Sequence, residues 1–304
     1  MELTLDKLLL DAQQRKASDL HITVGVGPKC RVNGELIDMG YPPLTPDNTL
    51  ELIMPIIPKE LKEQFDNSCD IDFAYSIPGV GRFRVNVFKQ RGTYAMVLRI
   101  INTVVPSPEH LGIPKQVVEL TAKKRGLILV TGPTGSGKST TLASLIDVIN
   151  TGYSRHIITL EDPIEFLHKH NKSIVNQREI GSDFISFSKA LRVTLRQDPD
   201  VIMIGEMRDL DTTRAAITAA ETGHLVLSTL HTPDSSQSID RILDIFPAYQ
   251  QDQVKLQLAN ILIGVCSQQL IPLLEGGRIV ATELMWAVPA VCNCIRERKI
   301  HGIK

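Results

Sequence analysis

A run of eight residues, from Gly132 to Ser139, has the residue types and spacing of a loop that holds the phosphates of a nucleotide. The run fits the pattern G-x-x-x-x-G-K-[ST] at every fixed position. A predicted buried strand at 127–130 precedes it, and a predicted helix at 139–149 follows it. In this context the glycines let backbone N–H groups point at phosphate oxygens, and the helix N-terminus adds partial positive charge. The sequence therefore predicts binding of a nucleoside triphosphate rather than a chance glycine-rich turn.

The side chains at the end of this loop are expected to handle the terminal phosphates and a metal ion. Lys138 can reach the β- and γ-phosphates, and the Ser139 hydroxyl can bind Mg²⁺. The residues that we expect to bind ATP are Gly132, Pro133, Thr134, Gly135, Ser136, Gly137, Lys138, Ser139 and Thr140.

A second apolar segment, 201–205, is predicted to be a strand and is followed by an acid, Glu206. An acid at the carboxyl end of a neighbouring strand can orient Mg²⁺ or the water that attacks the γ-phosphate. We therefore expect Glu206 to polarise the water and to contribute to the metal site. The alternative is a solvated carboxylate at a strand end.

Three carboxylates, Glu161, Asp162 and Glu165, follow another predicted strand at 156–160. Acids grouped beside a nucleotide suggest handling of a metal ion or of water. The alternative is capping of a helix around Pro163, because acids favour a helix N-terminus. Spacing does not choose between Glu161 and Glu165, and we expect Glu161 among the metal ligands.

Two histidines, His224 and His231, bracket the predicted buried strand at 225–229. A histidine after such a strand can sense the γ-phosphate and pass its presence to a neighbouring subunit. A lone histidine is more often structural, but two histidines that bracket one core strand keep the functional interpretation open beside the structural one.

Arg82 and Arg84 are predicted to share one face of a strand with Asn86, since side chains alternate along a strand. The default interpretation is a solvated face. The alternative is that these arginines reach ATP held by an adjacent subunit, where planar guanidinium groups suit phosphate oxygens.

The elements that must position these residues divide the chain into two predicted domains. Residues 1–101 combine helical and alternating strand patterns, which favours a small α+β domain. The proline-rich stretch 102–114 is the best linker candidate. Residues 115–304 alternate apolar strands with amphipathic helices, including a predicted helix at 251–264, which favours a mostly parallel α/β sheet covered on both faces.

Composition narrows the class of protein. The 304 residues are 43% hydrophobic and 22% charged, with a formal net charge of −1, so nothing in the charge favours nucleic-acid binding. The five cysteines are irregularly spaced, which fits a reducing cytosol. We see no signal peptide and no apolar run long enough for a membrane helix.

Four segments described above, in their order along the chain, resemble those of the type II/IV secretion ATPases: the nucleotide loop, the acidic segment, the segment around Glu206 and the segment with the two histidines. The resemblance covers nearly the whole chain and lies in 132–139, 159–165, 205–209 and 222–232, with a family signature at 191–200. Within the family, the pilus retraction ATPases are the most similar. That similarity lies in 17–21, 81–86, 176–179 and 239–247.

The resemblance implies an N-terminal PAS-like domain, a C-terminal RecA-like P-loop domain and a homo-hexamer. It also implies a cytoplasmic motor at the inner face of the bacterial inner membrane, which uses ATP and Mg²⁺ to pull pilin from a type IV pilus. The expected partners are an inner-membrane platform protein and other pilus machinery. Membrane association is then peripheral, through proteins, and no nucleic acid is expected.

Residue by residue, the resemblance implies Glu206 as the catalytic acid and Glu165 as the acid of the acidic box. The residues it adds are the histidine pair His224 and His231, and the trans-acting arginines Arg82, Arg84 and Arg99.

The C-terminal region departs from the family pattern. The retraction-linked motif reads A-V-C-N-C-I-R-E from Ala290 to Glu297, with Cys292 and Cys294 where the family has Arg and Leu. Relatives usually continue beyond the position of Lys304, so we expect a truncated or short member.

Three alternative functions remain open. A pilus assembly or secretion ATPase usually carries a tetracysteine zinc site, which the five scattered cysteines do not match. A low-turnover scaffold is disfavoured by an intact Glu206. A DNA motor is disfavoured by the neutral charge and by the lack of an aromatic and basic strand-binding run.

Overall fold

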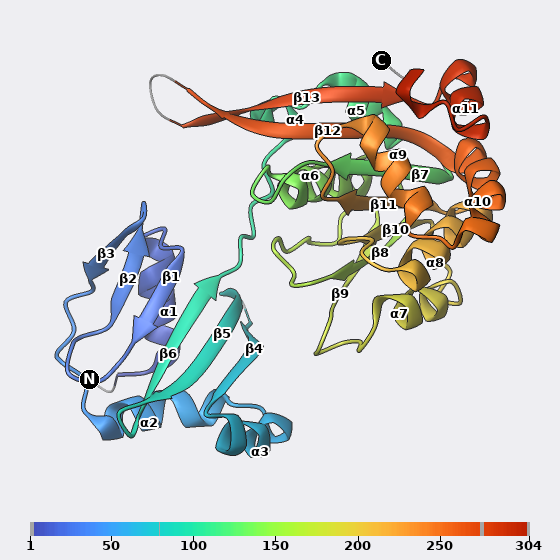
Figure 1. The fold of residues 1–304 in the computed structure, drawn as a ribbon. Helices are drawn as coiled ribbons and strands as arrows, with labels where there is room; N and C mark the ends of the chain where they lie inside the picture. Colours follow the sequence, from blue (N-terminus) through green and yellow to red (C-terminus); the bar gives the residue numbers. More distant parts are fainter. Residues whose placement is uncertain (1–2, 79, 274–276, 303–304) are drawn as a thin grey trace. The chain divides into compact units, whose positions relative to one another are not determined.

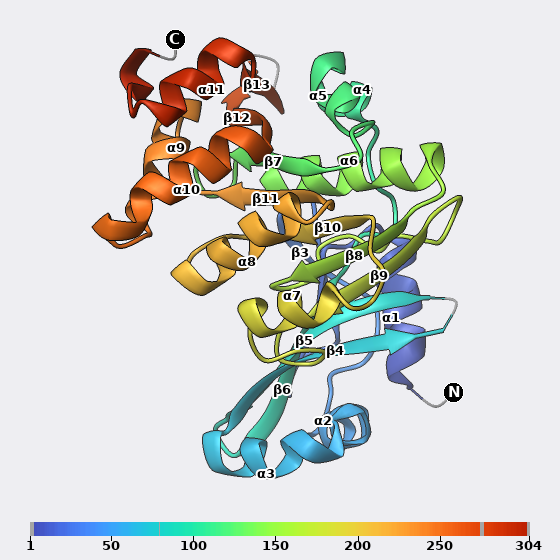
Figure 2. The ribbon, with the colours of Figure 1, turned by 90° about the vertical axis from the view of Figure 1, so that its right-hand side faces the viewer.

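A computed structural model describes residues 3–78, 80–273 and 277–302, drawn as ribbons in Figures 1 and 2. The chain forms two compact units, Met1–Thr103 and Val104–Lys304. Most of the stretch expected as a linker, 102–114, therefore belongs to the second unit, where it includes the short helix α4. Among the described residues, no helix has both the length and the apolar character to cross a membrane.

The first unit contains a six-stranded sheet in the order β3-β2-β1-β6-β5-β4, and every neighbouring pair is antiparallel. Its strands are β1 (Asp19–Ile22), β2 (Lys29–Val32), β3 (Glu35–Asp38), β4 (Asp70–Ile77), β5 (Gly81–Gln90) and β6 (Thr93–Ile100). Its helices are α1 (Leu5–Gln14), α2 (Pro46–Ile53), the 3₁₀ turn η1 (Met54–Ile56) and α3 (Lys59–Ser68).

Local sequence explains these elements well. The apolar positions of α1 are buried at helical spacing, and Thr45 caps α2 by accepting a hydrogen bond from the N–H of Asn48. On β5 the side chains of Phe83, Val85 and Val87 are fully buried. The predicted alternation on this strand is therefore confirmed, with the arginines on the opposite face.

The second unit contains a seven-stranded sheet in the order β13-β12-β7-β11-β10-β8-β9. All neighbours are parallel except β12 and β13, which form an antiparallel hairpin. The strands are β7 (Gly126–Thr131), β8 (His156–Glu161), β9 (Ile174–Glu179), β10 (Val201–Ile204), β11 (Leu225–Leu230), β12 (Leu262–Pro272) and β13 (Arg278–Trp286). This confirms a mixed α/β fold with a mostly parallel sheet.

Helices cover both faces of this sheet, as Figure 2 shows. They are α4 (Pro108–Leu111), α5 (Lys115–Leu120), α6 (Lys138–Gly152), α7 (Phe187–Thr194), α8 (Leu210–Glu221), α9 (Ser235–Asp244), α10 (Ala248–Ile261) and α11 (Pro289–Arg296), with a 3₁₀ turn η2 (Ile300–Gly302). Strands β7, β8, β10 and β11 each contribute to two cores: Leu127 and Leu129 of β7 face one, and Ile128 and Val130 face the other. Double-sided burial explains why these strands are continuous apolar runs.

One predicted element is wrong in its extent. The segment 251–264 was expected to be one helix, but α10 ends at Ile261 and β12 begins at Leu262. Apolar residues continue across this junction, and a short buried run has no periodicity that separates helix from strand. For the same reason the sequence did not reveal the hairpin of β12 and β13, which forms one edge of the sheet.

Candidate nucleotide-binding and hydrolysis site

A pocket of about 660 Å³ lies along the carboxyl edge of the parallel strands in the second unit. This edge is where α/β proteins bind ligands, because each strand there gives way to a loop that can carry functional side chains. Of the predicted nucleotide contacts, those that line the pocket are Thr134, Gly135, Gly137, Lys138, Ser139 and Thr140. The predicted loop, strand and helix are thus brought to one place.

The loop between β7 and α6 has the backbone that its glycines permit. Gly132, Gly135 and Gly137 all have positive φ, at 146°, 77° and 88°. At Gly132 a side chain is excluded twice, because a Cβ would collide with the carbonyl oxygen of Gln268 and with the Ser136 hydroxyl. The glycines are therefore required by the curled loop and its close packing.

Glu206 is fixed on the loop after β10 by contacts on both sides of it. The Thr229 hydroxyl of β11 donates a hydrogen bond to the Gly205 carbonyl at 2.6 Å. Asp209 caps α8 by accepting from the N–H and the hydroxyl of Thr212, both at 2.8 Å. The acid is thus held beside the end of β11, which carries His231.

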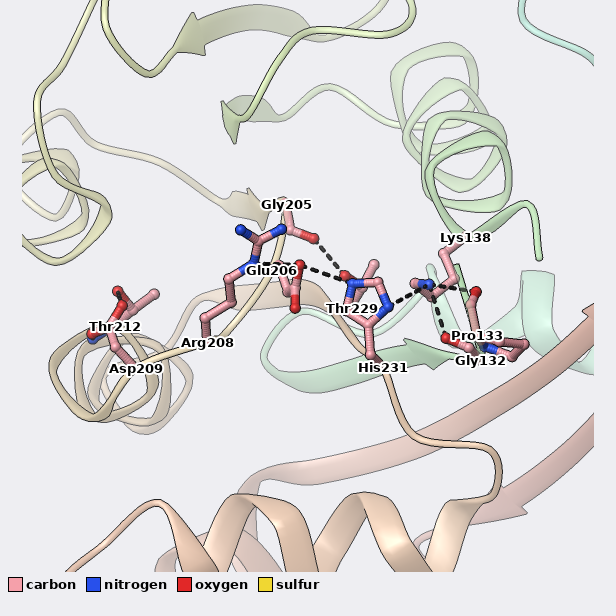
Figure 3. A network of polar contacts seen from close by, with 10 residues as sticks. All are labelled: Gly132, Pro133, Lys138, Gly205, Glu206, Arg208, Asp209, Thr212, Thr229 and His231. Atoms are coloured by element: carbon pink, nitrogen blue, oxygen red, sulfur yellow. Dashed lines mark hydrogen bonds and ion pairs between the residues drawn. The ribbon is translucent and has the colours of Figure 1, made fainter. Parts of the chain in front are cut away.

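Four side chains form a chain of polar contacts across the pocket, shown in Figure 3. Lys138 Nζ lies 3.4 Å from His231 Nδ1, and His231 Nε2 lies 3.0 Å from Glu206 Oε2. Arg208 Nε donates to the same Glu206 oxygen at 2.8 Å. A cation from the start of α6, a histidine after β11 and a carboxylate after β10 therefore meet where the γ-phosphate is expected.

The partners of His231 determine which of its nitrogens carries the proton. The ammonium of Lys138 can only donate, so Nδ1 must accept, and Nε2–H then donates to Glu206. Lys138 also donates to the carbonyls of Gly132 and Pro133, each at 2.9 Å. Burial lowers the pKa of Lys138, while the nearby charges of Glu206 and Glu165 oppose that shift.

The acidic box after β8 contains two different kinds of carboxylate. Glu161 is buried and accepts from Thr159 Oγ1 at 2.6 Å and from Gln177 Nε2 at 3.0 Å. Burial raises the pKa of Glu161 to about 7, and these hydrogen bonds only partly offset the shift. Glu165 also lines the pocket but is exposed. No helix occurs at 161–170, so the helix-capping alternative for these acids is wrong.

The two histidines of the predicted pair lie at opposite ends of strand β11. His231 follows β11 and lines the pocket, whereas His224 precedes β11. Six strand residues separate them, which corresponds to roughly 20 Å. His224 Nδ1 lies 2.9 Å from the Ala219 carbonyl of α8. The structure therefore does not bring the pair together within one chain.

Arg82, Arg84 and Arg99 lie on the sheet of the first unit, on β5 and β6. Arg84 and Arg99 are direct cross-strand neighbours, and Arg82 shares their face. Arg99 Nε donates to Asp19 Oδ1 at 3.0 Å, yet its side chain is 69% exposed. Arg84 Nε is 3.9 Å from Asp72 Oδ1, and the side chain of Arg84 is about half exposed. The three arginines thus share one face of this sheet, where Arg84 and Arg99 lie beside carboxylates.

Sequence reasoning missed the contribution of the β12–β13 hairpin. Leu270 and Arg278 line the pocket, and Gln268 Nε2 donates to the Ser136 carbonyl of the nucleotide loop. Gln268 and Ser136 are 132 residues apart in the chain. No local pattern links residues at such a distance, and only the sheet order, which places β12 beside β7, brings them together.

The donor set of the pocket fits Mg²⁺ better than a metal held by protein alone. Among the described residues there is no group of three or more His, Cys, Asp or Glu side chains that could hold a metal ion. Mg²⁺ is usually held by one or two protein oxygens together with substrate phosphates and water. Ser139 and Glu206, which both line the pocket, provide such a partial set.

Comparisons with known proteins agree with this geometry. Residues 1–299 match the family model described as type II/IV secretion system protein. A type IV pilus retractation ATPase, PilT of Pseudomonas aeruginosa, is 46% identical over 296 residues, which is 97% of this chain and 86% of the relative. A twitching motility protein of Neisseria gonorrhoeae is 43% identical over 91% of this chain and 74% of the relative.

A solved structure is also similar, that of the pilus retraction motor PilT with bound ADP. It superposes with a TM-score of 0.92 at 50% identity and covers 99% of this chain and 88% of that one. The loop and acid at the sheet edge, the family model and these relatives all agree, and the chain belongs to the type II/IV secretion system protein family.

Proposed function

We propose that the protein is a P-loop ATPase that hydrolyses ATP to ADP and phosphate in order to do mechanical work. The observation that carries this proposal is the contact chain from Lys138 through His231 to Glu206 beside the loop. Lys138 would leave the loop carbonyls and bind the β- and γ-phosphates, while Glu206 accepts a hydrogen bond from the attacking water. His231, which touches both groups, would register whether the γ-phosphate is present.

Ser139 and Glu206 are the residues that we propose to hold Mg²⁺, which would neutralise charge on the transferred phosphoryl group. Glu161 was also expected among the ligands, but its carboxyl group is engaged by Thr159 and Gln177. We therefore propose that Glu161 has a supporting role in the acidic box after β8, and that Glu165 is the acid of this box that acts in the pocket.

We infer that the work is retraction of a type IV pilus by a homo-hexamer. The support comes from relatives whose names record pilus retraction and twitching motility, and from their coverage of nearly the whole chain. In this proposal the first unit is PAS-like, the second is RecA-like, and the ring acts at the cytoplasmic face of the inner membrane. It would act on the pilus machinery through a platform protein, with peripheral attachment and without nucleic acid.

Phosphate release and pilus counts test the two levels of this proposal. Purified protein with ATP and magnesium should release phosphate, and Lys138→Ala should abolish both release and nucleotide binding. Absence of phosphate release by the wild type under all conditions would contradict the ATPase proposal.

Deletion of the gene should leave cells with more pili that do not retract. Loss of pili would instead indicate the assembly function.

The arginine face of the first unit leads to a separate proposal, that Arg82, Arg84 and Arg99 complete the site of a neighbouring subunit. Arg84→Ala should then keep nucleotide affinity but lose most turnover. Mixing Arg84→Ala subunits with inactive Glu206→Gln subunits should restore part of the activity, because some interfaces then pair an intact acid with an intact arginine. Absence of any restoration in rings shown to be mixed would contradict action in trans.

A further inference from the structure

Strand β12 runs along the nucleotide loop as well as along β7. The parallel register pairs Cys266 with Val130 and Ser267 with Thr131, the last residue before the loop. Thr131 Oγ1 donates a hydrogen bond to Ser267 Oγ at 2.8 Å, and both residues are buried. The strand then continues past the end of β7, so its next residue, Gln268, lies against the loop itself.

Gln268 contacts the loop at three points. Its Nε2 donates to the Ser136 carbonyl at 2.6 Å. Its own carbonyl oxygen occupies the space that a Cβ at Gly132 would need, and its Nε2 lies 3.3 Å from where a Cβ at Gly137 would be. Gln268 therefore packs against the loop with both its side chain and its backbone carbonyl.

Water does not compete for this contact. Gln268 and Ser136 are each 2% exposed. In such a dry, low-dielectric setting a hydrogen bond is strong, and its loss leaves a buried carbonyl unsatisfied.

The bond to Ser136 also sets the direction of the next N–H group. The carbonyl of Ser136 and the N–H of Gly137 belong to one planar trans peptide, so they point in opposite directions. Because the carbonyl is held on β12, the Gly137 N–H is turned away from β12, and Gly137 lines the pocket. Inward-pointing N–H groups are what a phosphate-binding loop requires.

We propose that Gln268 is a positioning residue that holds the loop in its phosphate-binding shape by fixing the Ser136–Gly137 peptide. The inference rests on the proposed nucleotide binding at this loop. It assigns to the hairpin strand a role in nucleotide affinity, because the strand that clamps the loop continues to Leu270, which lines the same pocket.

Titration of a fluorescent ADP analogue into purified protein tests this role. Gln268→Met keeps the length of the side chain but removes the donor, and it should raise Kd roughly ten-fold. Gln269→Met is a matched control, because Gln269 is the next residue on the same strand but is exposed. It should bind the analogue within about two-fold of the wild type.

Gln268→Glu changes the hydrogen-bonding groups of this side chain while nearly keeping its shape. A carboxylate cannot donate to the Ser136 carbonyl, whereas a protonated carboxyl group can, and burial should raise the pKa of such a group toward neutrality. The ratio of its Kd to that of the wild type should therefore be large at pH 8 and fall toward one as the pH is lowered.

The outcomes separate this inference from the function on which it rests. If the wild type binds the analogue and Gln268→Met binds it equally well, the positioning role is wrong and the ATPase proposal stands. A pH-independent Kd ratio for Gln268→Glu would also overturn it. If the wild type binds no nucleotide, both proposals fail.

Discussion

The two edges of the parallel sheet carry similar polar residues but use them differently. At the carboxyl edge, Lys138, His231 and Glu206 contact one another across the pocket. At the amino edge, the backbone N–H of His156 donates to Asp200 Oδ2 at 2.8 Å, and the ring Nδ1 of His156 lies 3.0 Å from the Asp198 carbonyl. There, an acid and a histidine again lie at strand starts, but their partners are mainly backbone groups.

The difference shows how position in the fold decides the role of a residue type. Side chains at the amino edge satisfy backbone donors and acceptors where strands begin, which stabilises the sheet locally. Side chains at the carboxyl edge are hydrogen-bonded to each other and line the pocket, so a ligand in the pocket can replace these hydrogen bonds with its own. Substitutions at the two edges should therefore affect different measurements.

The largest expected effect is at Glu206. Glu206→Gln keeps the shape and a hydrogen bond to its neighbours but removes the negative charge that polarises water. Turnover should fall roughly a thousand-fold while ADP affinity changes little. Phosphate release and analogue binding measure the two quantities. Turnover within ten-fold of the wild type would show that another group activates the water.

Glu161 tests whether a buried carboxyl group at the carboxyl edge lowers the stability of the fold when it ionises. Its folded-state pKa of about 7 exceeds its ordinary value of 4.5, so the folded protein binds more protons than the unfolded chain between these pH values. The free energy of unfolding should therefore fall as the pH rises from about 4.5 to about 7, by roughly 3 kcal/mol in total. Glu161→Gln, which stays neutral, should lack this component.

The single tryptophan, Trp286 on β13, allows this measurement on the second unit by denaturant unfolding followed through fluorescence. Glu165→Gln is the matched control, since Glu165 belongs to the same loop but is exposed. It should show the pH dependence of the wild type. Parallel curves for Glu161→Gln and the wild type would refute the contribution of Glu161.

The paired histidines provide the most direct test of the comparison. His231→Ala removes the link between Lys138 and Glu206 and should lower turnover roughly ten- to a hundred-fold. His224 lies outside the pocket of its own chain, so His224→Ala should keep turnover within about two-fold of the wild type. It should lower the free energy of unfolding by about 1 kcal/mol. Equal losses of turnover in the two variants would mean that His224 reaches a site on a neighbouring subunit.

The smallest effect is expected at Asp200. Asp200→Asn weakens the hydrogen bond from the His156 N–H at the amino edge, which should cost about 1 kcal/mol of stability. Nucleotide affinity and turnover should not change. A change in affinity without a change in unfolding would show that the amino edge is coupled to the pocket.

The sequence by itself determined the nucleotide loop, the acid after β10 and most helices and strands, because each rests on local spacing. Glycines that permit positive φ, a cap at Thr45 and alternation on β5 are properties of neighbouring residues. Only the tertiary structure decided that His231 and not His224 faces the pocket, and that Glu161 is buried while Glu165 is exposed.

The same holds for Gln268, which lies against Ser136 only because β12 is placed beside β7. Strand order and strand direction decide which loop ends meet, and they depend on packing between segments that are far apart in the chain. A pattern of neighbouring residues records which side chains alternate or repeat, but it carries no information about the partner strand. The residues of the loop could therefore be named from the sequence, whereas the groups that hold and complete it could not.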